Sequence, residues 1–469
     1  MIVLKFGGTS VGSAERMKAL ASLINSNEPK IVVLSAMSGT TNALVEIANA
    51  LYARENDKAK KLIDALEKKY EEVLKELFSK DSSLNKGKDL VKNHFEFIRS
   101  FTLDMFTANE EKAILDQGEL LSTALEHFYL EEIGIDSVLL PALNFMRIDE
   151  NDEPDLKYIE ENLKAELKKH QAPSRAALAA SGSPKGGESG GGAHVKSPLR
   201  GAGGPLFITQ GYICRNAFGE IDNLKRGGSD YTATLIGAAL TSEEVQIWTD
   251  IDGMHNNDPR IVSKTFPVTE LSFDEAAELA YFGAKILHPT CVLPAQKRKV
   301  PVRLLNTMQP QAKGTVITDK ASSDRITAVA AKDGIIAVKI KSARMLLAYG
   351  FLRSVFEIFE RYKTPIDMIT TSEVAVSVTI DTDKNLDAII KELKEFCSVE
   401  VDKDQTIVCV VGSFSAEKQG VAAKILESLK NIPLRMISYG GSENNVSVLI
   451  DSKYKKDALV ALNKGLFGL

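Results

Sequence analysis

The chain has 469 residues, with 58 lysines and arginines against 63 aspartates and glutamates, and a formal net charge of −5. This length is enough for two or three domains with substantial cores, and the nearly balanced charge favours neither a nucleic-acid groove nor a polybasic membrane patch. The apolar runs are too short to span a bilayer, and the 4 cysteines are widely spaced with no metal-type or redox pairing, so we expect no membrane partner and a cytoplasmic protein.

Two strand-turn-helix units are predicted at the start of the chain. Ile2 to Phe6 is an apolar run broken only by Lys5, which is typical of a strand buried in a parallel sheet and not of a signal peptide. Ile31 to Leu34 is a second such run. The turns that follow, Gly7 to Ser10 and Ser38 to Asn42, each precede a predicted helix. This order predicts a βαβ unit with ligand-binding loops at the strand ends.

Two later stretches are not predicted to contain catalytic or ligand-binding residues. Between residues 57 and 106 the apolar spacing predicts two long amphipathic helices with a structural role. Gln171 to Pro205 is rich in Gly, Ser, Ala and Pro and has almost no large apolar residues. Such a composition buries too little surface to offset the entropy of ordering, so we predict a disordered low-complexity insert at 171–205.

The central feature is the stretch from Lys225 to Ala233, which turns from a loop into a helix. Its two glycines let the backbone approach a ligand, and Ser229 or Asp230 is expected to cap a helix over Tyr231 to Leu240. The free amides of that helix start, with Arg226 beside them, suit an anionic substrate. An ordinary helix cap after a Gly-Gly turn is the alternative.

The elements around this stretch continue the alternation of strands and helices. Strands are predicted at Leu206 to Cys214, Val245 to Thr249 and Val300 to Asn306, and a helix at Phe273 to Tyr281. This part of the chain is predicted to end near Thr318.

The C-terminal part carries an internal repeat, in which residues 367–381 are echoed by 435–451. Each copy has a strand and a helix before it and a helix after it. The first copy gains a fourth strand at Val399 to Val401, whereas the second copy ends without one. A strand at Ile326 to Ala331 precedes the first copy, and we infer that it completes the second. The first module would then be inserted within the second.

Phosphoryl transfer to a carboxylate brings two negatively charged groups together. Like unit charges ~4 Å apart cost about 4 kcal/mol at an effective dielectric near 20, so such a site needs fixed cations and amide donors more than a base. Lys5, Arg226 and Lys285 are the candidate cations. The alternatives are an edge-strand lysine for Lys5 and a surface lysine late in a helix for Lys285, and Arg260 could cap a turn after Asp-Pro.

Six motifs, in chain order, resemble those of the aspartokinase family. They are Lys5-Phe6-Gly7-Gly8-Thr9-Ser10, Ser38-Gly39-Thr40-Thr41-Asn42, Gly118-Glu119-Leu120, Arg226-Gly227-Gly228-Ser229-Asp230-Tyr231, Trp248-Thr249-Asp250 and Phe282-Gly283-Ala284-Lys285. The resemblance covers nearly the whole chain apart from 171–205. The resemblance is to the monofunctional type, since no dinucleotide motif of a fused homoserine dehydrogenase follows the repeat, and the effector-loop residues given below resemble those of lysine-sensitive members.

The resemblance implies the fold and the reaction. The fold would be the α/β amino-acid-kinase fold, a mainly parallel sheet sandwiched by helices, followed by two α+β ACT modules. The expected domains are a catalytic domain at 1–320, a first ACT module at 334–402, and a second at 326–332 plus 403–469. The reaction would be ATP-dependent phosphorylation of the β-carboxylate of L-aspartate to 4-phospho-L-aspartate, the first step towards lysine, threonine, methionine and diaminopimelate.

The resemblance also implies roles for single residues. The catalytic residues would be Lys5, Asp230 and Lys285. The aspartate pocket would be formed by Ser35, Thr41, Glu119, Tyr212, Arg226, Gly227, Ser229 and Asp230. The nucleotide would contact Lys5, Gly7, Gly8, Ser10, Thr249, Asp250, His255, Asp258, Arg260 and Lys285, although many relatives have Tyr at the position of His255. Asp230 is the base in common descriptions of the family, but we favour an organising role because the aspartate carboxylate is already ionised (reference pKa ~3.9).

Cofactor and partners follow in the same way. Mg²⁺ would be carried mainly by ATP, and we name no protein ligand for it. Lysine, with threonine as the second choice, would inhibit by binding to the ACT modules at Met345, Gly350, Phe351, Leu352, Ile366, Asp367, Thr371, Ser372 and Glu373. A homodimer or higher oligomer through the ACT modules is expected, because pairing covers a sheet edge. The alternative for the effector acids is that Asp367 and Glu373 are solvated strand-end residues.

Two other functions stay open at this point. A kinase for another acidic amino acid, such as glutamate or acetylglutamate, would have the same catalytic fold but not the paired ACT modules. A catalytically inactive ACT-type amino-acid sensor would not need Lys5, Glu119, Arg226 and Asp230 together. The motifs therefore favour the aspartate kinase.

Overall fold

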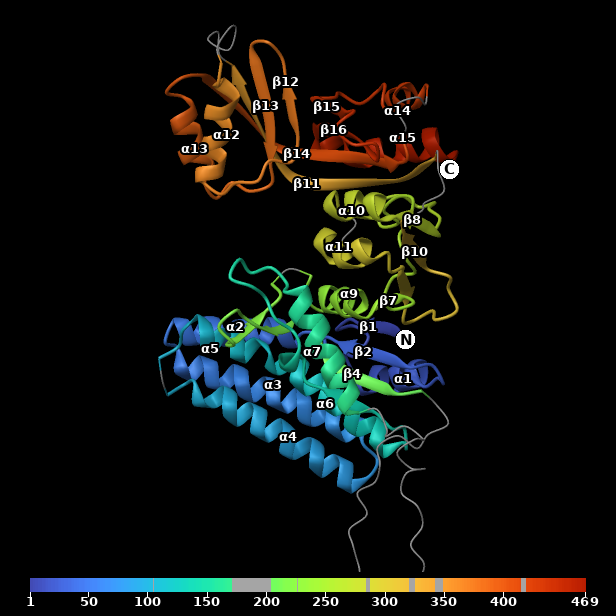
Figure 1. Ribbon diagram of the computed structural model, residues 1–469. Coiled ribbons are helices and arrows are strands. Elements are labelled where there is room, and N and C mark those ends of the chain that lie inside the picture. The colour runs from blue at the N-terminus through green and yellow to red at the C-terminus, as the bar shows by residue number, and fades with distance from the viewer. Residues whose placement is uncertain are drawn as a thin grey trace, which may run out of the picture. The chain divides into compact units, whose positions relative to one another are not determined.

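The computed structural model describes residues 1–103, 105–170, 204–225, 227–283, 287–319, 325–341, 349–414 and 419–469. The predicted insert, apart from Gly204 and Pro205, lies outside these ranges, as do Arg226, Lys285 and Met345. The chain forms two compact units (Figure 1). The first unit is Met1–Asp252 with Thr290–Thr318, and the second is Gly253–Pro289 with Asp319–Leu469. The predicted domain boundaries remain a prediction.

The first unit is built on a mainly parallel sheet with the strand order β3-β4-β2-β1-β7-β9-β10. Only β10 runs antiparallel to its neighbour β9 within this order. The strands are β1 (Ile2–Phe6), β2 (Lys30–Leu34), β3 (Val138–Leu140), β4 (Leu206–Gln210), β7 (Val245–Thr249), β9 (Val302–Asn306) and β10 (Thr315–Thr318). Because β1 pairs with β2 on one side and β7 on the other, Lys5 does not lie on an edge strand.

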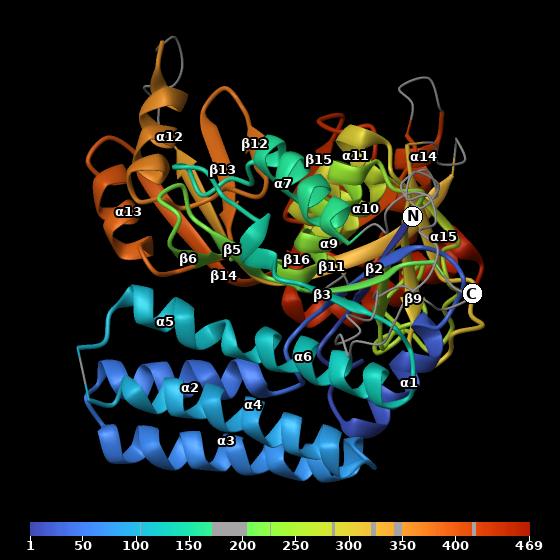
Figure 2. The ribbon, with the colours of Figure 1, turned by 60° about the horizontal axis from the view of Figure 1, so that its bottom comes forward.

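Helices cover this sheet, and a helical layer lies on one side of it. The helices are α1 (Ala14–Ile24), α2 (Thr40–Tyr52), α3 (Asn56–Leu77), α4 (Asp81–Ser100), α5 (Ala108–Leu115), α6 (Gln117–Glu132), α7 (Leu156–Lys169), α9 (Gly228–Leu240) and α11 (Pro289–Arg298), with a 3₁₀ turn η1 (Ala142–Asn144). Figure 2 shows α2 to α6 side by side. Helices α3 and α4 are the two predicted amphipathic helices, and their apolar stripes join the core that includes Tyr70 and Phe95.

Two local predictions in the first unit were wrong. Leu206 to Cys214 is not one strand, because Tyr212 has a left-handed backbone with φ 69°. Strand β4 ends at Gln210, and β5 (Ile213–Arg215) forms a separate hairpin with β6 (Ile221–Asn223). Neither Ser229 nor Asp230 caps α9, because the cap residue is Gly227, with φ 75° and no side-chain bond.

The second unit contains a sheet with the strand order β12-β13-β11-β14-β16-β15. Its strands are β11 (Ile326–Lys341), β12 (Ile369–Thr371), β13 (Ala375–Ile380), β14 (Ser398–Gly412), β15 (Met436–Tyr439) and β16 (Asn445–Asp451), and β8 (Glu270–Ser272) also belongs to this unit. Its helices are α10 (Phe273–Tyr281), α12 (Phe351–Arg361), α13 (Leu386–Leu393), α14 (Val421–Ser428) and α15 (Lys455–Phe467), with a 3₁₀ turn η3 (Ser452–Tyr454).

Strands β11 and β14 are shared by the two ACT modules. They pair antiparallel from Ile326 with Gly412 to Lys341 with Ser398, with register shifts near Lys332 and Ile335. Figure 1 shows both strands passing from the half with α12 and α13 to the half with α14 and α15. The strand predicted at Ile326 to Ala331 and the strand expected at the start of the first copy are therefore one strand, and Val399 to Val401 lies within β14 near its start. Each half has its own apolar core, one around Val355 and Val376 and the other around Val408 and Leu459.

Among the helices within the described ranges, none is both long and apolar enough to cross a membrane. Helix α6 nevertheless has an unusual core residue. The Glu126 side chain is fully buried, and neither carboxyl oxygen has a hydrogen-bond partner among the described residues. Burial raises the pKa of Glu126 well above its usual value. Such a carboxyl group costs stability unless it is protonated.

We expect Glu126→Met to stabilise the protein at neutral pH by roughly 1–3 kcal/mol, the usual cost of one unsatisfied buried polar group. The folded-state pKa lies above the unfolded value of about 4.3, so stability is lost as pH rises from there through the folded pKa. The gain should therefore be larger at pH 8 than at pH 6. Thermal unfolding of both variants, with Glu126→Gln as the uncharged control, measures it. A Met variant that is less stable at both pH values would mean that the carboxyl group is satisfied in solution.

Candidate active site

Lys5 and Asp230 form an ion pair at the carboxyl end of β1. The Lys5 Nζ lies 2.7 Å from the Asp230 Oδ1, and only 11% and 18% of the two side chains are exposed. Asp230 sits in the first turn of α9 and faces Lys5 instead of capping the helix. A cation that is held this firmly and shielded from water is suited to stabilising a phosphoryl group.

The neighbouring residue of α9, Ser229, connects the helix to β2. The Ser35 Oγ donates to the Ser229 Oγ at 2.8 Å, and Ser35 directly follows β2. The backbone of Gly211 lies against Ser229, since a Cβ at Gly211 would be 2.3 Å from the Ser229 Cβ. Only glycine fits there, so the chain passes close to α9 directly before the left-handed Tyr212.

The glycine turn after β1 lies close to the end of β2. The Ser38 amide donates to the Gly8 carbonyl at 3.1 Å. A Cβ at Gly8 would lie 2.9 Å from the Ala36 carbonyl oxygen, and one at Gly7 would lie 3.3 Å from the Lys5 Nζ. This turn therefore leaves little room for side chains beside Lys5 and exposes its backbone to a ligand.

Glu119 on α6 is the buried acid of the site. It is 5% exposed, and its Oε2 has no hydrogen-bond partner within the described part of the chain. Burial raises the pKa of Glu119 to about 7, while the backbone amide of Ala36 and the charge of Lys5 act in the opposite direction. An ammonium group placed at the free oxygen would stabilise the ionised carboxylate.

Asp116, one turn before Glu119, was missed by the sequence reasoning. It is 2% exposed, and neither of its oxygens has a partner among the residues described. Burial, followed by the charges of Glu119 and Asp222, raises its pKa well above the usual value. The spacing of three residues on a helix, which places the two carboxyls on one face, was the available signal.

Tyr212 lies between these acids and α9. Burial is the first cause that raises the Tyr212 pKa, followed by the charges of Asp116 and Glu119. Its backbone amide donates to the Thr232 Oγ1 at 2.9 Å, and a Cβ at Gly228 would be 3.0 Å from its ring. The first unit thus brings together Lys5, Ser35, Glu119, Tyr212, Gly227, Ser229 and Asp230.

Four other predicted residues also belong to the first unit, namely Ser10, Thr41, Thr249 and Asp250. Thr249 is the last residue of β7 and Asp250 follows it, and the Thr249 Oγ1 donates to the Asp250 Oδ1 at 3.0 Å. Ser10 is fully buried and shares a 2.7 Å hydrogen bond with Thr307, so its side chain supports the loop. Thr41 is exposed at the start of α2.

The remaining nucleotide candidates that the structure describes belong to the second unit. His255 Nδ1 is 2.9 Å from the Thr265 Oγ1. Arg260 pairs with Asp258 through its Nε at 2.9 Å and a terminal nitrogen at 2.7 Å, and the Arg260 amide also donates to Asp258. The turn-capping alternative therefore describes this local geometry, while the Arg260 side chain stays 76% exposed.

The effector candidates also lie in the second unit, in two local settings. Gly350 caps α12 with φ 88°, ahead of Phe351 and Leu352. Asp367 is not a solvated acid, because its side chain is 1% exposed and its Oδ1 accepts from Tyr281 at 2.6 Å and Lys332 at 2.9 Å. Ile366 is partly buried, whereas Thr371, Ser372 and Glu373 are exposed.

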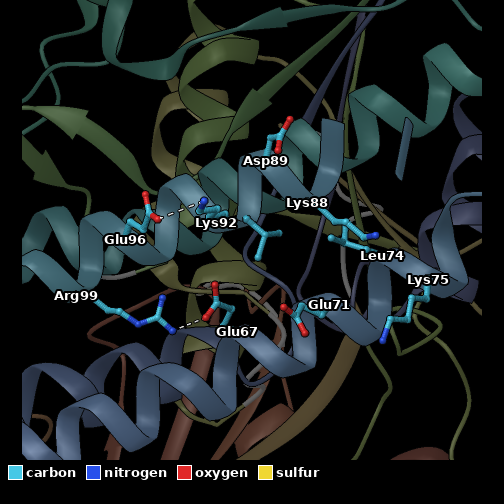
Figure 3. Close-up of a pocket in the computed structure, with 10 residues that line it drawn as sticks. Glu67, Glu71, Leu74, Lys75, Lys88, Asp89, Lys92, Glu96 and Arg99 are labelled. Carbon is cyan, nitrogen blue, oxygen red and sulfur yellow. Dashed lines mark hydrogen bonds and ion pairs between the residues drawn. The ribbon is translucent and has the colours of Figure 1, made fainter. Parts of the chain in front are cut away.

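A groove of about 450 Å³ on the α3–α4 hairpin is a separate feature (Figure 3). Lysines and carboxylates alternate along it, and Arg99 pairs with Glu67 while Lys92 pairs with Glu96 at 3.8 Å. Its charges largely neutralise one another and come from the helical layer, away from the strand ends. We therefore do not place the substrate there.

No group of three or more His, Cys, Asp or Glu side chains suited to a metal occurs within the described ranges. The groups that the described part of the site does offer are the Lys5 ammonium, backbone amides and hydroxyls, and the buried acids. Such a set can orient an ammonium-bearing acid and stabilise a transferring phosphoryl group.

Comparison with known proteins gives consistent matches. Residues 1–191 and 195–306 match the amino acid kinase family, and 408–466 match the ACT domain. The chain is 32% identical to aspartokinase 1 (chloroplastic) of Arabidopsis thaliana, over 99% of this chain and 80% of the relative. It is 31% identical to lysine-sensitive aspartokinase 3 of Escherichia coli, over 100% and 99%. The crystal structure of E. coli aspartokinase III with aspartate and ADP matches with a TM-score of 0.79 at 31% identity, covering 100% of both chains.

Proposed function

The chain belongs to the aspartokinase family, and we infer that it transfers the γ-phosphoryl group of ATP to the β-carboxylate of L-aspartate. The products are 4-phospho-L-aspartate and ADP, and the reaction is the first step of lysine, threonine and methionine biosynthesis. The observation that carries this inference is the shielded Lys5–Asp230 pair beside a buried acid, Glu119, at the ends of parallel strands. We further propose that the enzyme is cytoplasmic.

Aspartate would be oriented by groups of opposite charge. We propose that the Glu119 carboxylate receives the α-ammonium group, because its Oε2 is buried without a partner among the described residues. Ser35 and Ser229 lie within hydrogen-bond distance of each other, and their hydroxyl groups can donate hydrogen bonds to a substrate carboxylate. By family resemblance Arg226 pairs with the α-carboxylate, and Tyr212 closes the pocket beside Glu119.

In the transfer step an oxygen of the β-carboxylate attacks the γ-phosphorus as the bond to the ADP oxygen breaks. Negative charge moves from the carboxylate onto the phosphoryl oxygens and then onto ADP, and Lys5 is placed to stabilise it. No proton has to leave the carboxylate, whose reference pKa is ~3.9. Asp230 therefore acts as the residue that orients Lys5, and by resemblance Lys285 supplies a second cation.

Nucleotide binding is proposed for two groups of residues. Gly7 and Gly8 lie in the loop after β1, and Thr249 and Asp250 lie at the end of β7, whereas His255, Asp258 and Arg260 come from the second unit. As the family resemblance implies, Mg²⁺ would be carried mainly by the phosphates of ATP. Held in this way, Mg²⁺ would supply positive charge that offsets the charge of the phosphates during transfer.

A direct test is ATP-dependent hydroxamate formation with aspartate or glutamate as the acceptor. We expect signal with aspartate and little with glutamate, because the extra methylene moves the side-chain carboxylate away from the position set by Glu119 and Ser229. Signal with glutamate only would assign a different amino-acid kinase. Absence of signal with both, in a protein that still binds lysine, would favour an ACT-type sensor.

The affinity for aspartate should depend on the ionisation of Glu119. Its pKa of about 7 in the free enzyme means that the carboxylate form is lost as pH falls through 7. The ammonium group of aspartate binds that form, so kcat/KM for aspartate should fall on the acid side of pH 7 while kcat changes less. In Glu119→Gln the aspartate KM should rise by about tenfold or more, and this acid limb should disappear. An unchanged pH profile in Glu119→Gln would remove Glu119 from ammonium binding.

We also propose that the ACT modules form a dimer. Strand β12 is an outer strand of its sheet, and β15 is the other, and both expose apolar side chains. Ile369 is 45% exposed and Ile437 42% exposed. Unpaired strand edges of this kind tend to be covered by association.

Light scattering at micromolar concentration should therefore give at least twice the chain mass, with and without lysine. A double variant with charged residues on both outer strands, Ile369→Lys and Ile437→Lys, should shift the protein towards the monomer. Lys86→Glu, on the solvent-facing side of α4 in the first unit, is the surface control and should leave the mass unchanged. A monomeric parent protein in either condition would contradict the proposal.

A further inference from the structure

The loop that carries three of the proposed nucleotide contacts is part of the second unit. This loop, residues 254–268, is closed by two backbone bonds, from Val268 to the Met254 carbonyl at 2.7 Å and from Asn256 to the Phe266 carbonyl at 3.1 Å. It contains His255, Asp258 and Arg260. We call it the 254–268 loop.

Asn463, on α15 of the second ACT module, is the polar centre that holds this loop. Its Oδ1 accepts from the Asn256 Nδ2 at 3.1 Å and from the Asn257 Nδ2 at 3.4 Å. Its Nδ2 donates to the Lys264 carbonyl at 2.9 Å. The Asn463 side chain thus connects both the first and the last part of the loop to α15.

The two loop asparagines complete this network. The Asn256 Oδ1 accepts from the Phe266 amide at 2.8 Å, and the Asn257 Nδ2 donates to the Leu459 carbonyl of α15 at 3.0 Å. Asn256 is 0% exposed, and Asn257 and Asn463 are each 2% exposed. Buried amides in a network of this kind fix one geometry, because any other arrangement leaves polar atoms unsatisfied.

Apolar contacts attach the loop to the module independently of Asn463. Val262 belongs to the core of the second module with Val408 and Leu459. The Val329 amide of β11 donates to the Asn256 carbonyl at 2.8 Å. Loss of Asn463 should therefore leave the loop attached but change its conformation, which is the behaviour of a positioning residue.

We propose that Asn463 is a positioning residue for the nucleotide: from the ACT helix α15 it fixes the loop from which Asp258 and Arg260 contact ATP. This rests on the nucleotide contacts proposed above. Asp258 directly follows Asn257, and its amide donates to the Asn257 Oδ1 at 2.9 Å. A change in Asn463 is thus passed through Asn257 to the Asp258–Arg260 ion pair.

Loss of Asn463 should weaken the binding of the nucleotide but not the binding of aspartate. None of the residues that bring Lys5, Glu119 and Ser229 together belongs to this network. Asn463→Ala should raise the ADP dissociation constant and the ATP KM by about tenfold, since small errors in position weaken oriented contacts strongly. The aspartate KM should stay within about twofold of the parent. Asn257→Ala, which removes one arm of the network, should change the same two constants in the same direction.

The experiment measures ADP binding by titration calorimetry on the full-length chain, together with both KM values. Leu462→Ala is the matched control, because it truncates a fully buried neighbour on α15 without touching the network. It should lower the thermal stability and leave ADP binding unchanged. ADP affinity that is unchanged in both asparagine variants, or equally weakened in Leu462→Ala, would overturn the proposal. ADP binding does not need aspartate turnover, so a failure of the aspartate kinase assignment would be seen separately in the hydroxamate assay.

Discussion

Replacing Lys5 with alanine should nearly abolish phosphoryl transfer while leaving the fold intact. The Lys5 Nζ is 2.7 Å from Asp230 and largely shielded from water, so its charge acts on the transferring group at a low local dielectric. Loss of one such group in other enzymes costs about 10²–10³ in kcat. Because the charge develops in the transition state, kcat should fall much more than the aspartate KM rises. Initial rates at saturating ATP and aspartate measure the effect.

Two further variants separate the loss of charge from the loss of the ion pair. Lys5→Ala leaves Asp230 without its partner. The double variant Lys5→Ala/Asp230→Ala should therefore have a kcat no lower than that of Lys5→Ala alone. Asp230→Asn keeps the shape and removes the carboxylate. If Asp230 only orients Lys5, the fall in kcat should be smaller in Asp230→Asn than in Lys5→Ala, and this fall should not depend on pH. Near-normal kcat in Lys5→Ala would remove Lys5 from the mechanism, and a circular dichroism spectrum like the parent's guards against misfolding.

The sequence predicted the parts of the site that depend on local pattern. The apolar run around Lys5 predicted a strand buried in a parallel sheet, and β1 lies between β2 and β7. The glycine turns and the helices after them also appear where they were predicted. These features follow from periodicity and turn chemistry, which act over a few residues.

The wrong predictions concern side chains with distant partners. Ser229 and Asp230 have the chemistry of helix caps, but Ser35 and Lys5 are their partners, and Gly227 takes the cap position. The strand pattern is broken at Tyr212, which has a left-handed backbone, and the preceding Gly211 lies directly against Ser229. A sequence pattern does not contain these contacts, because they form only when β2, β4 and α9 meet.

The position of the 254–268 loop could not be predicted for the same reason. The composition of the loop does not indicate which hydrophobic core its apolar side chains join. In the structure Val262 packs into the core of the second ACT module. Asn463 lies about 200 residues later in the chain, and nothing near it in the sequence indicates a partner at Asn256. The sequence also did not predict that the two ACT modules would share β11 and β14, because their register is set by pairing along the whole strands.

Lysine should inhibit the enzyme, and Tyr281→Phe should weaken that inhibition. Asp367, the proposed acceptor for the effector's ammonium group, is already bound by Lys332 and by the Tyr281 hydroxyl at the end of α10. The Lys332 Nζ also lies 4.4 Å from the centre of the Tyr281 ring. An incoming ammonium group competes with Lys332 for Asp367, so effector binding alters the contacts of Tyr281. We expect a coupling of roughly 1–3 kcal/mol between lysine and substrate binding in the parent enzyme.

Titrating lysine and threonine separately, at sub-saturating aspartate, measures this coupling. Tyr281→Phe removes only the hydroxyl that reaches Asp367, so its rate without lysine should stay close to that of the parent while higher lysine is needed for half inhibition. Tyr362→Phe is the matched control, because it removes a 2.6 Å hydrogen bond to Glu392 in the same module without touching Asp367. Equal inhibition of both variants and the parent would exclude Tyr281 as the link. If neither amino acid slows the parent at millimolar concentration, the regulatory proposal fails and the kinase assignment stands, because the residues around Lys5 do not depend on Asp367.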